Sequence, residues 1–115
     1  MRRLMLLLIN IALVGVAVAG GGVHAADAPK EVVLTIEKNQ FKPDEIRVKA
    51  HAPFVLVITN KDAAAEEFES TELRIEKVIP AGKTVRLRVP ALKAGTYPFV
   101  GEYHESTAKG RIIAE

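Results

Sequence analysis

Short segments in which apolar and polar residues alternate run from Glu31 to the C-terminus, separated by Pro, Gly and Asn residues. Val32, Leu34 and Ile36 alternate with more polar neighbours in the first of them. A period of two is typical of a strand with one buried face. Segments of this kind, or apolar on both faces, are predicted as strands at 32–37, 46–49, 54–58, 73–79, 84–89, 96–100 and 110–114. About seven short strands at regular spacing predict an all-β sandwich.

The segments between these strands are predicted as loops. No ten-residue stretch has helical periodicity with good caps, so we expect at most one helical turn, over residues 63–67. Two of the loops, 60–69 and 100–106, hold most of the chemically reactive side chains. No repeat, linker or second domain interrupts the pattern.

The first 25 residues predict a signal peptide for export. Arg2 and Arg3 precede an apolar run from residue 4 to 19, three glycines follow, and Ala25 ends a small-residue cleavage motif. An uncleaved membrane anchor is the alternative, but the apolar run is shorter than the roughly 20 residues of a spanning helix. We therefore expect cleavage after Ala25, leaving residues 26–115 as one domain in the periplasm.

Cleavage changes what the composition implies. The full chain has 16 basic and 14 acidic side chains, but Arg2 and Arg3 leave with the signal peptide and no acidic residue does. The mature chain is then neutral and has no basic stripe of the kind that nucleic acid requires. It also has no methionine and no cysteine, because Met1 and Met5 both lie in the signal peptide. Thiol catalysis, thiolate metal sites and disulfides are excluded.

An enzyme is not expected. Ser70 and Ser106 lack the sequence context of an activated nucleophile, and only His51 and His104 remain as bases in the mature chain. His51 lies in a predicted turn and is interpreted as exposed and incidental. A paired-carboxylate mechanism requires a cleft that a sandwich of this size rarely provides.

Carboxylates and one histidine suggest a different chemistry. Loops at one end of a small sandwich lie near each other, so glutamates of the 60–69 loop can meet His104 of the 100–106 loop. Imidazole with two or three carboxylates suits Cu(II), Fe, Mn or Zn. The alternative is that these side chains are simply solvated in polar loops.

The chain resembles the cupredoxins over nearly all of its mature part. The N-terminal half of the resemblance is FKPDEIRVKA (41–50) followed by FVLVITN (54–60), and the C-terminal half is GTYPFVGEYH (95–104) followed by KGRII (109–113). The resemblance implies a Greek-key β-sandwich of cupredoxin type. Within the family it resembles cysteine-lacking, periplasmic cupredoxin domains that accompany bacterial iron-uptake permeases.

The resemblance also implies where the metal ligands of the family would fall. The first histidine ligand falls on Glu66 or Glu67, and the strand period favours Glu66 because it shares a face with the apolar Phe68. The cysteine ligand falls on Gly101, the second histidine on His104, and the axial methionine on or near Ala108. Blue copper requires a thiolate, so that type of centre is excluded.

These observations predict an exported, periplasmic cupredoxin-like protein that binds or delivers a copper or iron ion. The expected metal ligands are Glu66, Glu102 and His104, with Glu67 and Glu105 in reserve. The expected partners are the metal ion and a membrane iron or metal permease, or another periplasmic protein. The alternative function is a metal-free sandwich that serves as a binding or scaffolding module for an exported partner.

Overall fold

The structure is a computed structural model that describes residues 28–115. The signal peptide predicted for residues 1–25 lies outside the described residues. The described part consists of β1 (Lys30–Glu37), β2 (Gln40–Lys42), β3 (Glu45–Val48), β4 (Phe54–Asn60), β5 (Glu66–Ser70), β6 (Ile75–Ile79), β7 (Thr84–Val89), β8 (Gly95–Gly101), the 3-10 helix η1 (Glu102–His104) and β9 (Lys109–Ala114).

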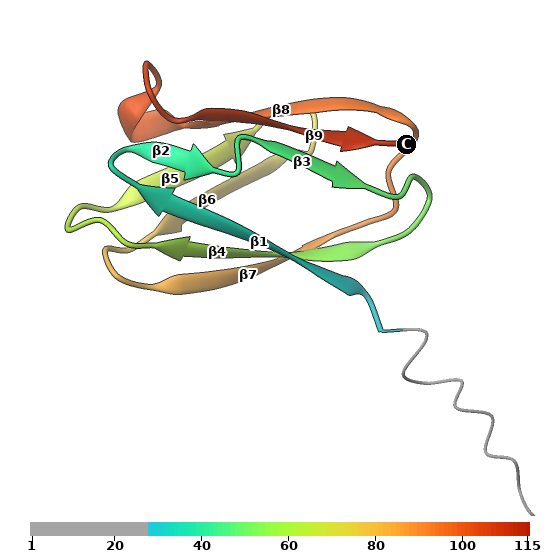
Figure 1. Cartoon of the computed structure of the whole chain (residues 1–115), viewed down its shortest axis with the longest axis horizontal. Coiled ribbons are helices and arrows are strands. Elements are labelled where there is room, and N and C mark those ends of the chain that lie inside the picture. The colour runs from blue at the N-terminus through green and yellow to red at the C-terminus, as the bar shows by residue number, and fades with distance from the viewer. Residues whose placement is uncertain (1–27) are drawn as a thin grey trace, which may run out of the picture.

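Two sheets face each other in a Greek-key sandwich (Figure 1). The four-stranded sheet has the order β2-β1-β4-β7 and the five-stranded sheet the order β3-β9-β8-β5-β6. The pairs β1–β4 and β3–β9 are parallel, whereas the other neighbours are antiparallel. The all-β sandwich predicted from the alternating segments is confirmed.

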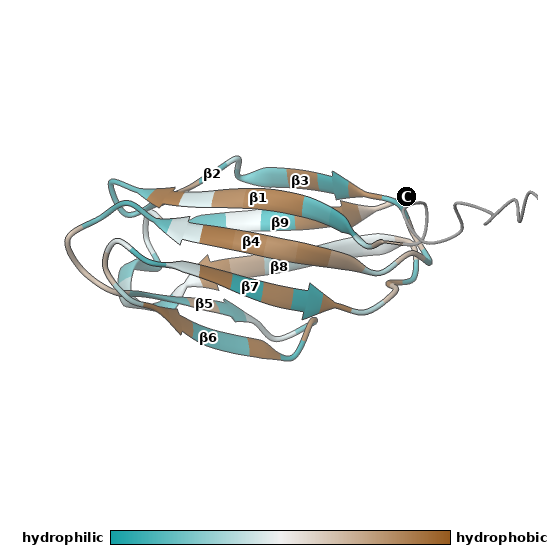
Figure 2. Ribbon diagram, turned by 90° about the horizontal axis from the view of Figure 1, so that it is seen from below, coloured by the Kyte–Doolittle hydropathy of each residue, from teal (hydrophilic) through white to brown (hydrophobic). Residues whose placement is uncertain are grey.

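Burial follows the alternation in the sequence. Phe54, Leu56 and Ile58 of β4 point into the sandwich, whereas Val55 and Val57 between them are only partly buried. Figure 2 shows the resulting apolar stretches along β1 and β4. Because successive side chains of a strand point to opposite faces, this register places one apolar set from each sheet in the interior.

Three phenylalanines form the centre of the core. Phe41, Phe68 and Phe99 contact one another, with ring centroids 5.0 to 6.0 Å apart and two of the three pairs edge to face. Such geometries are favourable for aromatic pairs. Phe41 belongs to β2, while Phe68 and Phe99 belong to β5 and β8, so the cluster joins the two sheets. It lies under the strands that carry the acidic residues discussed below.

The segment Glu66–Ser70 is where the prediction was wrong. It was assigned to a loop with one helical turn over 63–67, but it forms β5 between β8 and β6. Its only apolar residue is Phe68, so the sequence alone has no alternating pattern there. Backbone pairing with both neighbours holds it as a strand despite its three glutamates. Leu73, predicted to be in a strand, lies in the β5–β6 turn.

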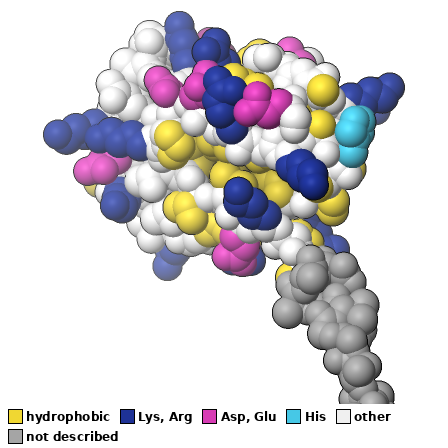
Figure 3. All heavy atoms as spheres, turned by 45° about the vertical axis from the view of Figure 1, so that its right-hand side comes forward, with side chains coloured by type: hydrophobic (Ala, Val, Ile, Leu, Met, Phe, Trp, Pro, Cys, Tyr) yellow, Lys and Arg dark blue, Asp and Glu magenta, His cyan; other side chains and the backbone are white. Residues whose placement is uncertain are grey.

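On the face drawn in Figure 3, basic and acidic side chains are interspersed. No helix in residues 28–115 has the length and apolar character needed to cross a membrane.

Candidate functional site

A buried asparagine fixes the loop that leads into β5. Asn60 is fully buried, and its side-chain amide donates to the carbonyl oxygens of Ala64 and Ile79 at 2.9 and 3.0 Å. Its Oδ1 accepts from the backbone N–H of Asp62. These three hydrogen bonds order the loop 61–65, so that β5 starts at a defined position with Glu66.

Glu66 and His104 form a direct contact at this end of the sandwich. Glu66 Oε2 lies 2.5 Å from His104 Nδ1. The side chain of Glu66 is 2% exposed and that of His104 is 30% exposed. Charge-assisted hydrogen bonds of this length are strong, and partial burial reduces the screening of the pair by solvent. The pair therefore has one buried acceptor and one partner that reaches the surface.

The second carboxylate oxygen of Glu66 is also occupied. Oε1 accepts from the backbone N–H groups of Glu67 and Tyr103, each at 3.0 Å. The 3-10 turn η1 presents the second of these donors, because it directs the chain back over the start of β5 after Gly101. Glu66 thus has a hydrogen-bond partner for both oxygens, as a buried carboxylate requires.

Gly101 is packed against this carboxylate. A Cβ atom at Gly101 would lie 2.6 Å from Ala108 Cβ, 2.7 Å from Glu66 Cδ and 2.9 Å from Glu66 Oε1. Real Cβ atoms do not approach other heavy atoms so closely. The space in which a side chain from position 101 would extend is therefore filled by Glu66 and Ala108.

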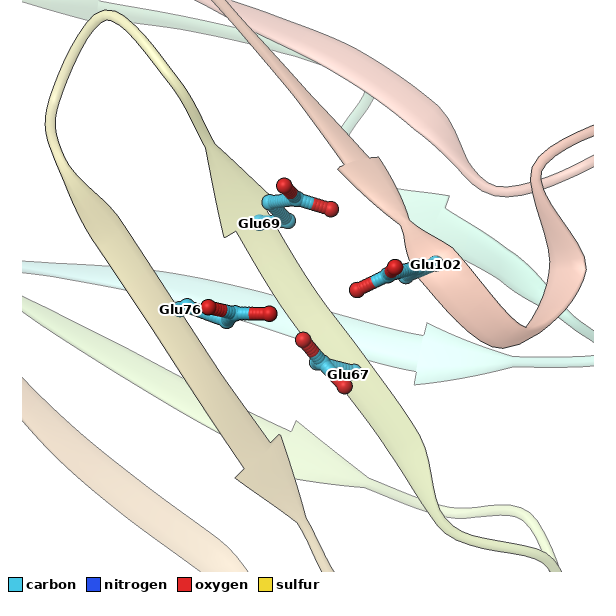
Figure 4. Close-up of side chains that lie close together, drawn as sticks. All are labelled: Glu67, Glu69, Glu76 and Glu102. Carbon is cyan, nitrogen blue, oxygen red and sulfur yellow. The ribbon is translucent and has the colours of Figure 1, made fainter.

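Glu102 belongs to a different group, on the outer face of the five-stranded sheet. The carboxylates of Glu67, Glu69, Glu76 and Glu102 converge over β5, and one oxygen from each lies within 4.8 Å of the others (Figure 4). In residues 28–115 this is the one group of three or more potential ligands that meets this distance. We call these four residues the glutamate cluster.

The glutamates of the cluster alter one another's ionisation. The Glu67 carboxylate raises the pKa of Glu102 to about 7 and also raises the pKa of Glu76. The pKa of Glu67 is lowered because Glu76 and Glu102, when protonated, can donate to it. Like charges that share a site make the removal of the last protons unfavourable. Around neutral pH the four carboxylates of the metal-free cluster are therefore not all ionised.

Tyr103 lies beside the cluster. Desolvation raises the pKa of its hydroxyl, and the neighbouring Glu67 carboxylate raises it further. Half of the Tyr103 side chain remains exposed. The ring thus lies close to Glu67 while remaining accessible to solvent.

Comparison with known proteins gives the family. The profile of the "Cupredoxin-like domain" family matches residues 10–114. The chain belongs to the cupredoxin-like family. An uncharacterized protein of Rickettsia prowazekii (strain Madrid E) is 36% identical to it over 83 residues, which is 72% of this chain and 66%, just under two thirds, of that relative.

Solved structures agree with the fold of this cupredoxin-like chain. Auracyanin A of Chloroflexus aurantiacus, a "blue" copper protein, superimposes with a TM-score of 0.65 at 14% identity, covering 76% of this chain and all of the other. The metal-binding domain of a Cu(I)-exporting P-type ATPase of Streptococcus pneumoniae D39 has a TM-score of 0.66 at 16% identity, covering 74% and 84%. At these identities the likeness concerns the fold.

The residues of this cupredoxin-like protein do not fit a blue-copper centre. It has no cysteine, and the position at which the family resemblance places one, Gly101, has no room for a side chain. Glu66 and His104, predicted as ligands, are brought together. The third predicted ligand, Glu102, lies with the glutamate cluster, and the described residues do not form a common group of Glu66, Glu102 and His104.

The other reactive residues take different positions. Glu67, held in reserve as a ligand, points to the outer face, whereas Glu105 and His51 are exposed. Glu76 was not recognised from the sequence. Glu76 joins the cluster because it lies opposite Glu69 in the pairing of β5 with β6. The alternation of residues within one strand does not reveal which residue of the neighbouring strand lies opposite.

Proposed function

We propose that the mature chain is an exported, periplasmic metal-binding protein that binds a copper or iron ion through Glu66 and His104. The observation that carries this proposal is the contact between Glu66 Oε2 and His104 Nδ1. A carboxylate oxygen and an imidazole nitrogen on facing segments are suitable ligands for a borderline ion. Blue-copper electron transfer is not part of the proposal, since no thiolate exists.

The chemistry of the pair follows from its two donor atoms. An ion bound there would take the place of the hydrogen bond between Glu66 Oε2 and His104 Nδ1, with the imidazole proton on Nε2. Glu66 supplies a negative charge and His104 a neutral nitrogen, and solvent supplies the other ligands. The partly exposed His104 gives access from the surface. Few protein ligands and open access suit delivery to a membrane permease or another periplasmic partner better than permanent storage.

One observation favours a second candidate, the metal-free binding module. Both oxygens of Glu66 have partners without any ion, and the carboxylate fills the space beside Gly101. In this alternative the Glu66–His104 pair replaces the metal centre and holds the loop end of the sandwich together.

A metal titration separates the two candidates. The chain from Ala26 onward is stripped of metal and titrated with Cu(II), Fe(III), Mn(II) and Zn(II), with calorimetry for affinity and EPR for the copper ligands. Glu66→Gln and His104→Gln are compared with Glu105→Gln, which alters an exposed carboxylate next to the same turn. Circular dichroism checks that each variant is folded.

The metal-binding proposal predicts nitrogen coupling in the Cu(II) EPR spectrum and loss of this signal in His104→Gln, with Glu105→Gln unchanged. If no ion binds more tightly than the weak millimolar range, or if both pair variants bind as well as the wild type, the proposal is wrong. The first of these results would leave the metal-free module as the function.

A further inference from the structure

The glutamate cluster is built by two strands of the five-stranded sheet, β5 and β6, and by the turn η1 that follows β8. Glu67 and Glu69 alternate with Phe68 along β5, so both point away from the core. Glu76 lies directly opposite Glu69 on β6. On the other side of β5, Phe68 pairs with Gly101, so the next residue, Glu102, faces the same outer surface. Carboxylates thus enter the cluster from both sides of β5.

In the part of the chain that the structure describes, the cluster lacks a positively charged neighbour. Among residues 28–115, none of the four glutamates has a Lys, Arg or His partner within 4.0 Å. Elsewhere on the surface Glu45 pairs with Arg111 at 2.7 Å and Glu31 pairs with Arg86. Like charges directly opposite each other on neighbouring strands are destabilising. The cluster therefore differs from the ordinary acidic surface of this protein.

Glu67 provides an independent indication of a ligand. Its side chain points toward the other three carboxylates (Figure 4), yet the residue is only 9% exposed. Its Oε1 is buried and has no hydrogen-bond partner in the described part of the chain. A buried ionised oxygen without a partner is costly. A cation held among these carboxylates would place a positive charge beside the Glu67 side chain.

We propose that Glu67, Glu69, Glu76 and Glu102 form a binding site for a hard divalent cation of the Ca²⁺ or Mn²⁺ class. All four donors are carboxylate oxygens, which such ions prefer. One oxygen from each glutamate lies within 4.8 Å of the others, so all four can reach one ion. Ca²⁺ accepts a flexible arrangement of oxygen ligands, whereas Mg²⁺ demands near-ideal octahedral geometry and keeps several of its waters, so an open group of carboxylates favours Ca²⁺ over Mg²⁺.

This site goes beyond the proposed function, because it shares no residue with the Glu66–His104 pair and offers no nitrogen. Its affinity is limited by its position on an open sheet face, where two of the four glutamates are exposed. We expect a Kd on the order of 10⁻⁴ to 10⁻³ M, the range of extracellular Ca²⁺ modules. Such an affinity fits an ion that is abundant outside the cytoplasm.

Tyr103 allows the site to be observed directly. Tb³⁺ has the size and ligand preference of Ca²⁺, and its luminescence is sensitised by a nearby tyrosine. The protein has two tyrosines and no tryptophan, and Tyr103 is the one beside Glu67. We expect Tb³⁺ luminescence on binding, displacement by Ca²⁺ and Mn²⁺, and weaker displacement by Mg²⁺. Tyr103→Phe keeps all four carboxylates and should lose most of the signal while Ca²⁺ binding measured by calorimetry is retained.

The matched variants are Glu69→Gln/Glu76→Gln and, as the control, Glu72→Gln, an exposed carboxylate in the turn between the same two strands. The double variant removes two ligands, and we expect its Kd for Ca²⁺ to rise about tenfold or more. Glu72→Gln and His104→Gln should bind as the wild type does, which separates this site from the Glu66–His104 pair. The variants lack mutual repulsion and should remain folded, as circular dichroism will verify.

Two results would overturn the inference. One is no saturable binding of Ca²⁺, Mn²⁺ or Tb³⁺ to the wild type at concentrations up to about ten times the expected Kd range. The other is equal binding by the wild type and the Glu69→Gln/Glu76→Gln variant. If copper or iron does not bind at His104, the proposal of a Ca²⁺ site at the glutamate cluster still stands. If Ca²⁺ does not bind at the cluster, the proposal of a metal site at Glu66 and His104 still stands.

Discussion

Gly101→Ala tests the packing between the end of β8 and the Glu66 carboxylate. The backbone at Gly101 is extended, with φ −87° and ψ 104°, so alanine is compatible with the conformation itself. The added Cβ would approach Ala108 Cβ and two atoms of Glu66 to less than 3.0 Å. Overpacking of this kind typically costs about 1–3 kcal/mol. We expect a value near the upper end, because relief requires movement of Glu66 and loss of its hydrogen bonds.

Urea unfolding followed by circular dichroism measures the effect, and Gly95→Ala is the control. Gly95 lies at the other end of β8, and a Cβ atom there would make only ordinary contacts of 3.8–3.9 Å. We expect Gly101→Ala to unfold at a lower urea concentration than the wild type. The free energy of unfolding of Gly95→Ala should differ from that of the wild type by no more than about 0.5 kcal/mol. Equal stability of the two variants would refute the claim that Glu66 fills the space beside Gly101.

A double-mutant cycle identifies which neighbour is responsible. Glu66→Ala removes two of the three close contacts and leaves the one with Ala108. Gly101→Ala should therefore cost less in the Glu66→Ala background, with a coupling of about 0.5–3 kcal/mol. If the losses in free energy of unfolding from the two substitutions are additive, the Glu66 side chain moves aside without an energetic penalty. The packing argument would then be wrong.

Three further predictions concern ionisation and the loop before β5. The pKa of Glu102 is raised to about 7 from an ordinary value of 4.5, so the folded state binds this proton more tightly than the unfolded state. The melting temperature of the metal-free protein should therefore fall as the pH rises from about 5 to about 8. The fall should be smaller in Glu102→Gln. Asn60→Ala removes three hydrogen bonds to backbone groups, of which one is buried and two are partly buried. It should lower the free energy of unfolding by about 2–4 kcal/mol in a urea titration, and a loss below about 1 kcal/mol would contradict this. Arg111 lowers the pKa of Glu45, so Arg111→Gln should raise that pKa in an NMR titration. The free energy of unfolding should hardly change, because the pair lies at the surface. An unchanged pKa would show that the pair does not form in solution.

The strands with alternating residues were predictable because burial of one face dictates their pattern. Val85 and Leu87 alternate with Arg86 and Arg88, and β7 lies where expected. β5 was missed because Phe68 is its single apolar residue, so the strand shows no alternation of apolar and polar residues. Glu66 is buried with partners in His104 and in the backbone N–H groups of Glu67 and Tyr103. Two of these three partners, His104 and Tyr103, are distant in sequence.

The candidate sites show the same limit. The family resemblance led to Glu66 and His104, and the strand period favoured Glu66 over Glu67, so the pair was predictable. Glu102 was assigned to that pair because it is two residues from His104. Such spacing assumes an extended chain, but η1 turns the chain between them and directs Glu102 to the outer face. A helical turn of three residues leaves no periodic signal in the sequence.

Glu66 and Glu67 are consecutive in β5, and the backbone N–H of Glu67 donates to the carboxylate of Glu66. One peptide unit therefore connects the Glu66–His104 pair with the glutamate cluster. The two sites thus share a backbone segment but no side chain. A substitution that displaces the peptide between Glu66 and Glu67 acts on both sites, whereas a substitution of one side chain acts on one of them.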